Sequence, residues 1–131
     1  MLNAQEIFDK VTRHLFTQGR PAKHLGLCRY RDNEGRSCAV GCLIPEERYD
    51  PSFDNEASGG TAITAALGNP KFVQALADGG VDAAEHFDLL RSLQVVHDSM
   101  DTYGTIWLRE RLEGVAEVYG LSKDVLKEVR A

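Results

Sequence analysis

The sequence has no run of apolar residues that approaches the roughly eighteen needed for a membrane-spanning helix. Its N-terminal segment also lacks the apolar core of a secretion signal, because Glu6, Asp9 and Lys10 interrupt it. Internal repeats and low-complexity tracts are absent as well, which argues against a repeat array or a fibrous protein. These absences predict a soluble, cytoplasmic protein whose thiols stay reduced.

Cysteine is scarce, and its three residues do not form the even set that a disulfide framework requires. Cys28, Cys38 and Cys42, joined by His24 or His97, have the chemistry of a tetrahedral zinc site. Zinc modules usually draw their ligands in close pairs, and only Cys38 and Cys42 are spaced in this way. The favoured interpretation is therefore that the cysteines are small buried apolar residues, with zinc as a weak alternative.

Cofactor motifs are also missing. The sequence contains no dinucleotide fingerprint, and no lysine follows Gly59 and Gly60 as it would in a phosphate-binding loop. Asp50, Asp54 and Glu56 are close together but lack the spacing and central glycine of a calcium loop. We therefore expect no cofactor, and we assign these three acids to a binding surface on an exposed loop over residues 50–60.

The length and composition that remain are those of one globular domain, residues 1–131. Apolar residues make up 43% and charged residues 27%, which is enough apolar material for a single core. Acids outnumber bases by 20 to 15, so nucleic acid and anionic membranes are disfavoured as partners and a basic partner is favoured. The charge is divided unevenly: residues 1–42 carry a net +3 and residues 43–131 a net −8, together −5.

The first predicted element is a helix over residues 3–18. Asn3 followed by Glu6 is typical of a capping box, and apolar residues recur at helical spacing as far as Leu15. Gly19 ends the helix.

A β-hairpin is predicted over residues 25–41. Two short runs flank Asp32-Asn33-Glu34-Gly35, in which Gly35 supplies the positive φ that hairpin loops need. One face of this hairpin is expected to pack on the core, and the other is expected to present arginines.

The rest of the chain, residues 61–130, is predicted to be a helical body. Glycines divide it into the helices 61–67, 70–77, 83–100, 105–119 and 122–129. The break between the third and fourth of these helices is predicted at Tyr103–Gly104. The predicted fold class is therefore α+β: a predominantly helical single domain with one small antiparallel β-hairpin or sheet.

The hairpin also carries the predicted binding residues. Arg29, Arg31 and Arg36, together with Tyr30, form a basic and aromatic ridge that suits phosphate or clustered carboxylates, because arginine binds both with paired hydrogen bonds. The acidic body opposes direct binding of nucleic acid. A protein partner therefore fits the mixed charge better.

A cysteine-dependent enzyme is the alternative. Cys38 or Cys42 could act as a thiolate nucleophile near the end of a strand, with His97 as its base. Neighbouring helical residues point about 100° apart, which predicts that Asp98 does not orient His97 and that a separate carboxylate is needed. A hydrogen-bonded core histidine is the favoured interpretation of His97, so catalysis is not expected.

Several segments resemble a family of short uncharacterised proteins from bacterial, phage and prophage genomes. The resemblance is carried by Cys28–Arg31, the Gly35 turn, Ser37–Ile44, Tyr49, Leu93–Asp98 and Trp107. It implies no catalytic assignment. It does imply a context, because small phage-associated proteins often bind host machinery and inhibit bacterial defence systems.

The sequence therefore favours a small interaction protein that acts through charged surfaces in the bacterial cytoplasm, in the manner of an anti-CRISPR inhibitor. The expected partner is a host or bacterial protein, and a nucleic-acid-binding protein suits the acidic body. No membrane association is expected, and the oligomeric state is left open.

Overall fold

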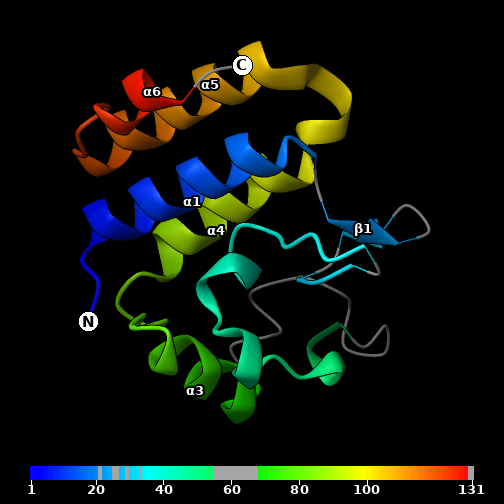
Figure 1. Ribbon diagram of the computed structural model, residues 1–131. Helices are drawn as coiled ribbons and strands as arrows, with labels where there is room; N and C mark the ends of the chain where they lie inside the picture. Colours follow the sequence, from blue (N-terminus) through cyan, green and yellow to red (C-terminus); the bar gives the residue numbers. More distant parts are fainter. Residues whose placement is uncertain (21, 25–26, 29, 33, 55–67, 130–131) are drawn as a thin grey trace.

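The protein is an assembly of α-helices around a segment of irregular structure (Figure 1). The computed structural model describes residues 1–20, 22–24, 27–28, 30–32, 34–54 and 68–129, and for residues 23–24, 27–28, 52, 54 and 101–105 it describes the backbone alone. The α-helices are α1 (Ala4–Gln18), α3 (Pro70–Asp78), α4 (Phe87–Asp98), α5 (Met100–Tyr119) and α6 (Val125–Glu128). Helix α1 contacts α4, α5 and α6. Helix α3 lies at the end of the molecule opposite α5 and α6 (Figure 1).

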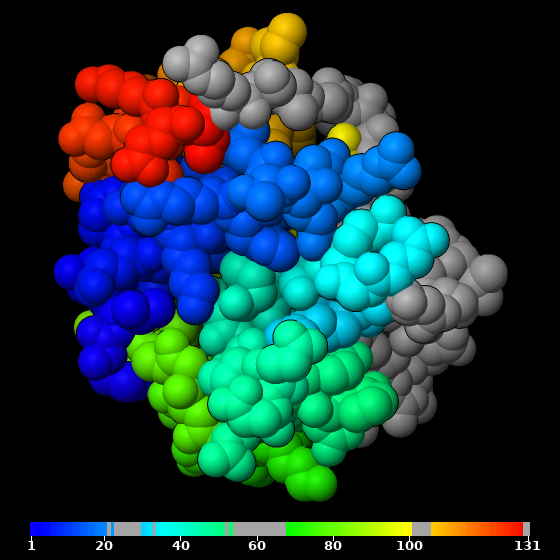
Figure 2. Space-filling model, in the orientation of Figure 1, coloured from blue at the N-terminus to red at the C-terminus, as the bar shows by residue number. Residues whose placement is uncertain are grey.

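Helix α1 begins where the sequence predicts. Asn3 Oδ1 accepts a hydrogen bond from the Glu6 amide at 2.8 Å, and Glu6 Oε1 accepts one from the Asn3 amide at 3.0 Å, which completes the capping box. Gly19 ends the helix in the left-handed conformation, at φ +70°. In Figure 2 this helix (blue) crosses the visible face between the C-terminal segment (red) and the segment around residue 40 (cyan).

The helix boundaries in the C-terminal half differ from the predicted ones at the starts of α4, α5 and α6, and α6 begins at Val125 instead of residue 122. Helix α4 begins only at Phe87. The Asp82 side chain accepts hydrogen bonds from the amides of Ala84 and Glu85, and these bonds hold residues 83–86 in a turn conformation. The break between α4 and α5 falls at Ser99 and not at Tyr103–Gly104, so α5 runs for 20 residues. Ser99 lies at this break and donates its hydroxyl proton to the Val95 carbonyl.

The α+β fold class and the hairpin over residues 25–41 are wrong, because the protein is helical. Among the described residues, extended pairing is limited to two-residue segments, β1 (Lys23–His24) with β2 (Leu27–Cys28), and to a single bridge between Arg31 and Ser37. These contacts are too short to form a sheet. Residues 38–41, the end of the predicted hairpin, form a turn that leads into the 3-10 helix η1 (Gly41–Leu43).

The segment 37–44 passes through the core instead of forming the edge of a hairpin. Its apolar side chains are buried against α1 and α4, and a short apolar run of this kind does not distinguish a buried strand from a buried turn. Gly41 allows the close passage, because a Cβ at this position would lie 2.3 Å from the carbonyl oxygen of Tyr30. The local hydrogen bonds from Cys42 to Cys38 and from Leu43 to Val40 close helical turns.

An aromatic cluster fixes α3 to the middle of the chain. The ring of Phe72 on α3 lies 4.9 Å from that of Tyr30 and 5.3 Å from that of Phe53, and Tyr49 packs edge-on against Phe53. Phe53 belongs to the 3-10 helix η3 (Pro51–Asp54), which follows η2 (Glu46–Arg48). Part of the predicted loop 50–60 is therefore helical and packed, while residues 55–60 and the predicted helix 61–67 lie outside the described residues.

None of the described helices is both long and apolar enough to cross a lipid bilayer.

The close passage at Gly41 generates a prediction. Gly41→Ala should lower the free energy of unfolding by about 1–3 kcal/mol, because the added methyl group meets backbone that cannot move aside. Thermal or urea unfolding measures the effect. Gly114→Ala, where an added Cβ meets nothing within 4 Å, is the matched control and should not destabilise the protein. Equal stability of the Gly41 variant and the wild type would contradict the packing.

Candidate functional site

His97 is fully buried, and both of its ring nitrogens are engaged in hydrogen bonds. Nε2 lies 2.9 Å from the backbone nitrogen of Ala22, which can only donate, so Nε2 is the unprotonated acceptor. Nδ1 therefore carries the proton and donates it to Asp98 Oδ1 at 2.8 Å. This geometry holds a neutral imidazole in one tautomer and connects α4 to the chain that follows α1.

The prediction that Asp98 cannot orient His97 is therefore wrong. The two side chains are neighbours at the last turn of α4, where Asp98 reaches back to the imidazole edge. Asp98 also accepts a hydrogen bond from Gln94 at 2.9 Å, and Gln94 Oε1 accepts one from the Val40 amide at 3.2 Å. One polar network thus joins α4 to the segments around Ala22 and Val40.

Neither Cys38 nor Cys42 has the surroundings of a nucleophile. Cys38 is buried, and its sulfur accepts a hydrogen bond from the Gly41 amide. The Cys42 thiol donates to the carbonyl of Ala39 at 3.1 Å, and burial raises the pKa of this thiol to about 12. A catalytic thiolate requires the opposite shift. Because both nitrogens of His97 are already in use, neither is available as a general base in this arrangement.

The zinc alternative gains no support from the part of the chain that the structure describes, since no three metal-ligating side chains converge there. Cys28 is the last residue of β2, and only its backbone is described.

The predicted basic ridge is divided between surface and core. Tyr30 is fully buried and packs on Phe72, so its ring faces the interior. Arg31 is mostly buried and spans two 3-10 helices: it pairs with Glu46 at 3.0 Å, donates to the Ile44 carbonyl at 2.8 Å and lies over the Tyr49 ring. Arg31 therefore stabilises the local fold.

Arg36 belongs to a tight turn centred on Asp32. The Asp32 carboxylate is almost completely buried and accepts hydrogen bonds from the amides of Glu34 and Arg36 and from the Arg36 guanidinium at 2.6 Å. Burial raises the pKa of this carboxyl, but the hydrogen bonds from Arg36 and Glu34 outweigh burial and leave the pKa below its usual value. Arg29, the remaining residue of the ridge, lies outside the described residues.

The predicted acidic binding residues are only partly placed. Asp50 is half-buried, with a carboxylate oxygen 3.9 Å from the Lys71 ammonium group. Asp54 is the last residue of η3, and Glu56 lies outside the described residues.

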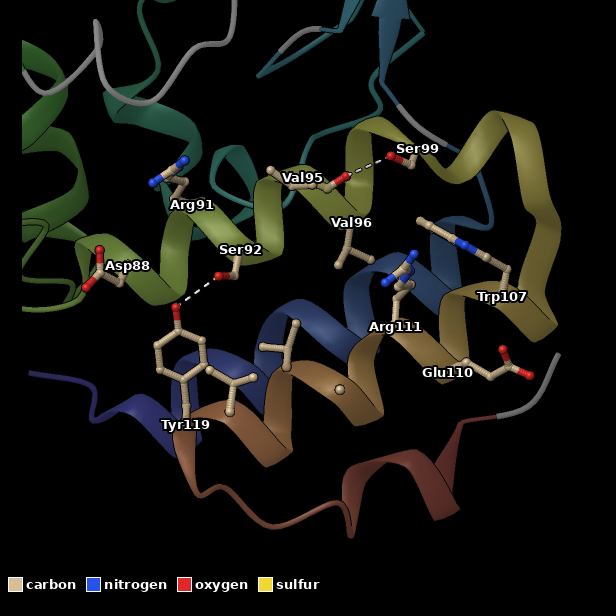
Figure 3. A pocket seen from close by; sticks show the side chains of 13 residues that line it. Asp88, Arg91, Ser92, Val95, Val96, Ser99, Trp107, Glu110, Arg111 and Tyr119 are labelled. Atoms are coloured by element: carbon tan, nitrogen blue, oxygen red, sulfur yellow. Dashed lines mark hydrogen bonds between the residues drawn. The ribbon is translucent and has the colours of Figure 1, made fainter.

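A recess among the described residues lies elsewhere, between α4 and α5 (Figure 3). This α4–α5 groove has a volume of about 900 Å³ and runs between two helices whose opposite side is covered by α1. One end is closed by the hydrogen bond between Ser92 and Tyr119, at 2.9 Å, and Trp107 stands at the other end. The Arg111 guanidinium lies 5.5 Å from the centre of the Trp107 ring.

The groove combines exposed apolar side chains with charge. Val95 on α4 is 58% exposed and Val118 on α5 is 78% exposed, and both line the groove. Gly114 adds no side chain between them. This site was not predicted, because the apolar periodicity of α4 and α5 indicates only their core faces. Its signal in the sequence is a second set of positions on each helix, spaced three or four residues apart.

No model of a known protein family, no curated protein and no solved structure matches the chain.

The state of the Cys42 thiol can be tested by alkylation. At pH 8, iodoacetamide should modify Cys42 in the native protein at least ~100-fold more slowly than in urea, because burial suppresses the thiolate. Peptide mass spectrometry after timed quenching gives the rate at this one residue. Rapid modification of the native protein would restore the cysteine-dependent alternative.

The Asp32 turn predicts a pH dependence of stability. A carboxyl whose folded pKa is lowered stabilises the protein fully above its unfolded pKa of about 4, and this contribution is lost as the pH falls from there through the lower folded pKa. Asp32→Asn should therefore cost about 1–3 kcal/mol at pH 7 and progressively less as the pH falls below 4, as measured by urea unfolding. Glu34→Gln is the control, because Glu34 pairs with the same arginine but is 73% exposed, and it should have little effect at either pH.

Proposed function

We propose that this protein is a small interaction module that binds a partner protein in the α4–α5 groove. The observation that carries the proposal is the exposure of Val95 and Val118 on facing sides of a groove of about 900 Å³. Large apolar side chains with such exposure are few among the described residues, and here two of them line the same recess. Burial of this surface against a partner supplies the driving force for association.

The electrostatics support a basic partner. The chain carries a net charge of −5, and residues 43–131, which contain both groove helices, carry −8. An acidic body of this kind attracts proteins with basic surfaces, and nucleic-acid-binding proteins have such surfaces.

The resemblance to small phage-associated proteins supports a more specific role. We propose that the protein acts inside the bacterial cell as an inhibitor of a defence system whose enzymes bind nucleic acid. In this role it occupies the basic surface that the nucleic acid would use. The cysteine-dependent alternative is not favoured by any described group, because the Cys42 pKa is raised and His97 is fully hydrogen-bonded.

The groove can be tested with a matched pair of variants. Val118→Glu places a charge inside the groove, while Ile106→Glu makes the same kind of change on α5 outside it, at nearly the same exposure of 75%. Both variants and the wild type serve as bait in bacterial lysates at low salt. We expect a basic protein that the wild type and Ile106→Glu retain and that Val118→Glu loses by at least ~10-fold, roughly the effect of 1.4 kcal/mol.

Binding constants for the purified partner decide the outcome. Equal affinity of the Val118→Glu and wild-type proteins would show that the groove is not the interface, and failure of the wild type to retain any protein would remove the proposal. Circular dichroism confirms that both variants remain folded.

A further inference from the structure

The side chains that line the α4–α5 groove recur at the spacing of a helix–helix seam. Among the lining residues, one such set on α4 is Ser92, Val95 and Ser99, and one on α5 is Trp107, Arg111, Gly114 and Val118; the other lining residues flank these sets. Successive residues in each set are three or four positions apart, which is the spacing at which a helix accepts the side chains of another helix. Because α4 and α5 run antiparallel, the two sets face the same groove from both sides (Figure 3).

Gly114 provides an independent indication of close approach. It lies inside the 20-residue helix α5, where alanine is preferred over glycine. The packing against the described part of the chain does not require the glycine, because a Cβ at this position would meet nothing within 4 Å. Gly114 therefore leaves a backbone surface in the groove that only an external group can fill, and a helix with a small residue at this level fits such a surface.

The charges at the edges of the groove specify the occupant further. Glu110 and Glu117 lie seven residues apart on α5, both exposed, on the side of the helix next to the Trp107–Val118 set. Glu117 pairs with Lys123, and Glu110 has no ion pair with any described side chain. On the α4 edge, Arg91 is exposed next to Asp88, and the exposed Arg111 belongs to the α5 set itself. In helix–helix seams, flanking positions seven residues apart are those where opposite charges select the partner.

We infer that the α4–α5 groove takes a single amphipathic helix with a basic edge, an inference that rests on the proposed function and identifies its binding element. The apolar face of this helix packs on Val95 and Val118, and a small residue lies over Gly114. Two Lys or Arg residues seven positions apart face Glu110 and Glu117, and an acidic residue faces Arg91. The distance from Trp107 to Val118 along α5 corresponds to about 16 Å, so three helical turns are sufficient.

A displayed library of helical peptides tests the inference directly. The probe is a 21-residue peptide with fixed helix-forming positions and randomised seam and flanking positions, selected against the purified wild-type protein. We expect enrichment of small and aliphatic residues at the seam and of Lys or Arg at one flank. The selected peptides should bind Ile106→Glu as tightly as the wild type, and Val118→Glu at least ~10-fold more weakly.

The charge assignment is tested by repeating the selection against the double variant Glu110→Lys, Glu117→Lys. The enriched flank should change from Lys and Arg to Asp and Glu. An unchanged flank would refute the basic edge. Selected peptides that depend on Val118 but lack helical spacing would refute the helix while leaving the groove as the interface. Binders insensitive to Val118→Glu, or no enrichment at all, would overturn both.

Gly114→Ala separates a binding role of this glycine from a structural one. The methyl group should raise the melting temperature by about 2–4 °C, because alanine is the better helix former. The same variant should bind the selected peptides at least ~10-fold more weakly, because the methyl group occupies the position of closest approach. A more stable protein with unchanged peptide affinity would show that the occupant does not contact Gly114.

Discussion

Side-chain hydrogen bonds to the backbone of residues 37–44 are the constraint on which the rest of the structure depends. The only regular structure of this segment is the short 3-10 helix η1, so several of its backbone amides and carbonyls need side-chain partners. Gln18 accepts from the Ser37 amide at 2.8 Å and donates to the Ser37 carbonyl at 2.9 Å, while His14 donates to the same carbonyl at 2.8 Å. Gln94, on the other side, accepts from the Val40 amide. Helices α1 and α4 are thus held at a distance set by the chain between them, because an unpaired buried amide or carbonyl would cost about 1–3 kcal/mol.

The same requirement explains why the residues with catalytic chemistry are not arranged as a catalytic site. His97 satisfies the Ala22 amide, Asp98 fixes the tautomer that makes this possible, and Gln94 connects Asp98 to Val40. The Cys42 thiol donates a hydrogen bond to the Ala39 carbonyl in the adjacent turn. His97, Gln94 and Cys42 thus each pair with a backbone group that lies outside the α-helices. A histidine beside a carboxylate is therefore a structural device here, and the chemistry left for function lies on the outer helices.

Local signals predicted the parts of the fold that local interactions determine. The capping box at Asn3 and the proline at the start of α3 act within one helical turn, and both helices begin where their signals stand. The hairpin failed for the opposite reason: the run from Cys38 to Ile44 is apolar throughout, and its conformation is decided by Gln18, Gln94 and the space beside Gly41, which are distant in sequence. The tautomer of His97 likewise depends on Ala22, 75 residues away. The groove was missed because seam positions are recognisable only once the core positions of α4 and α5 are known.

The position of the groove follows from this core. Helix α1 covers one side of the α4–α5 pair because it must also reach Ser37, and α6 is held against α5 through Arg109, which donates to the carbonyls of Leu126 and Val129. Both helices that could cover α4 and α5 are therefore engaged elsewhere. The remaining side of the pair is the α4–α5 groove, where lining residues recur every three or four positions. It contains two exposed valines and Gly114, which favours neither helix formation nor internal packing. A chain selected only for stability would replace that glycine and those valines with alanine and polar residues. Their presence together on one side of the pair is best explained by a partner that completes the packing.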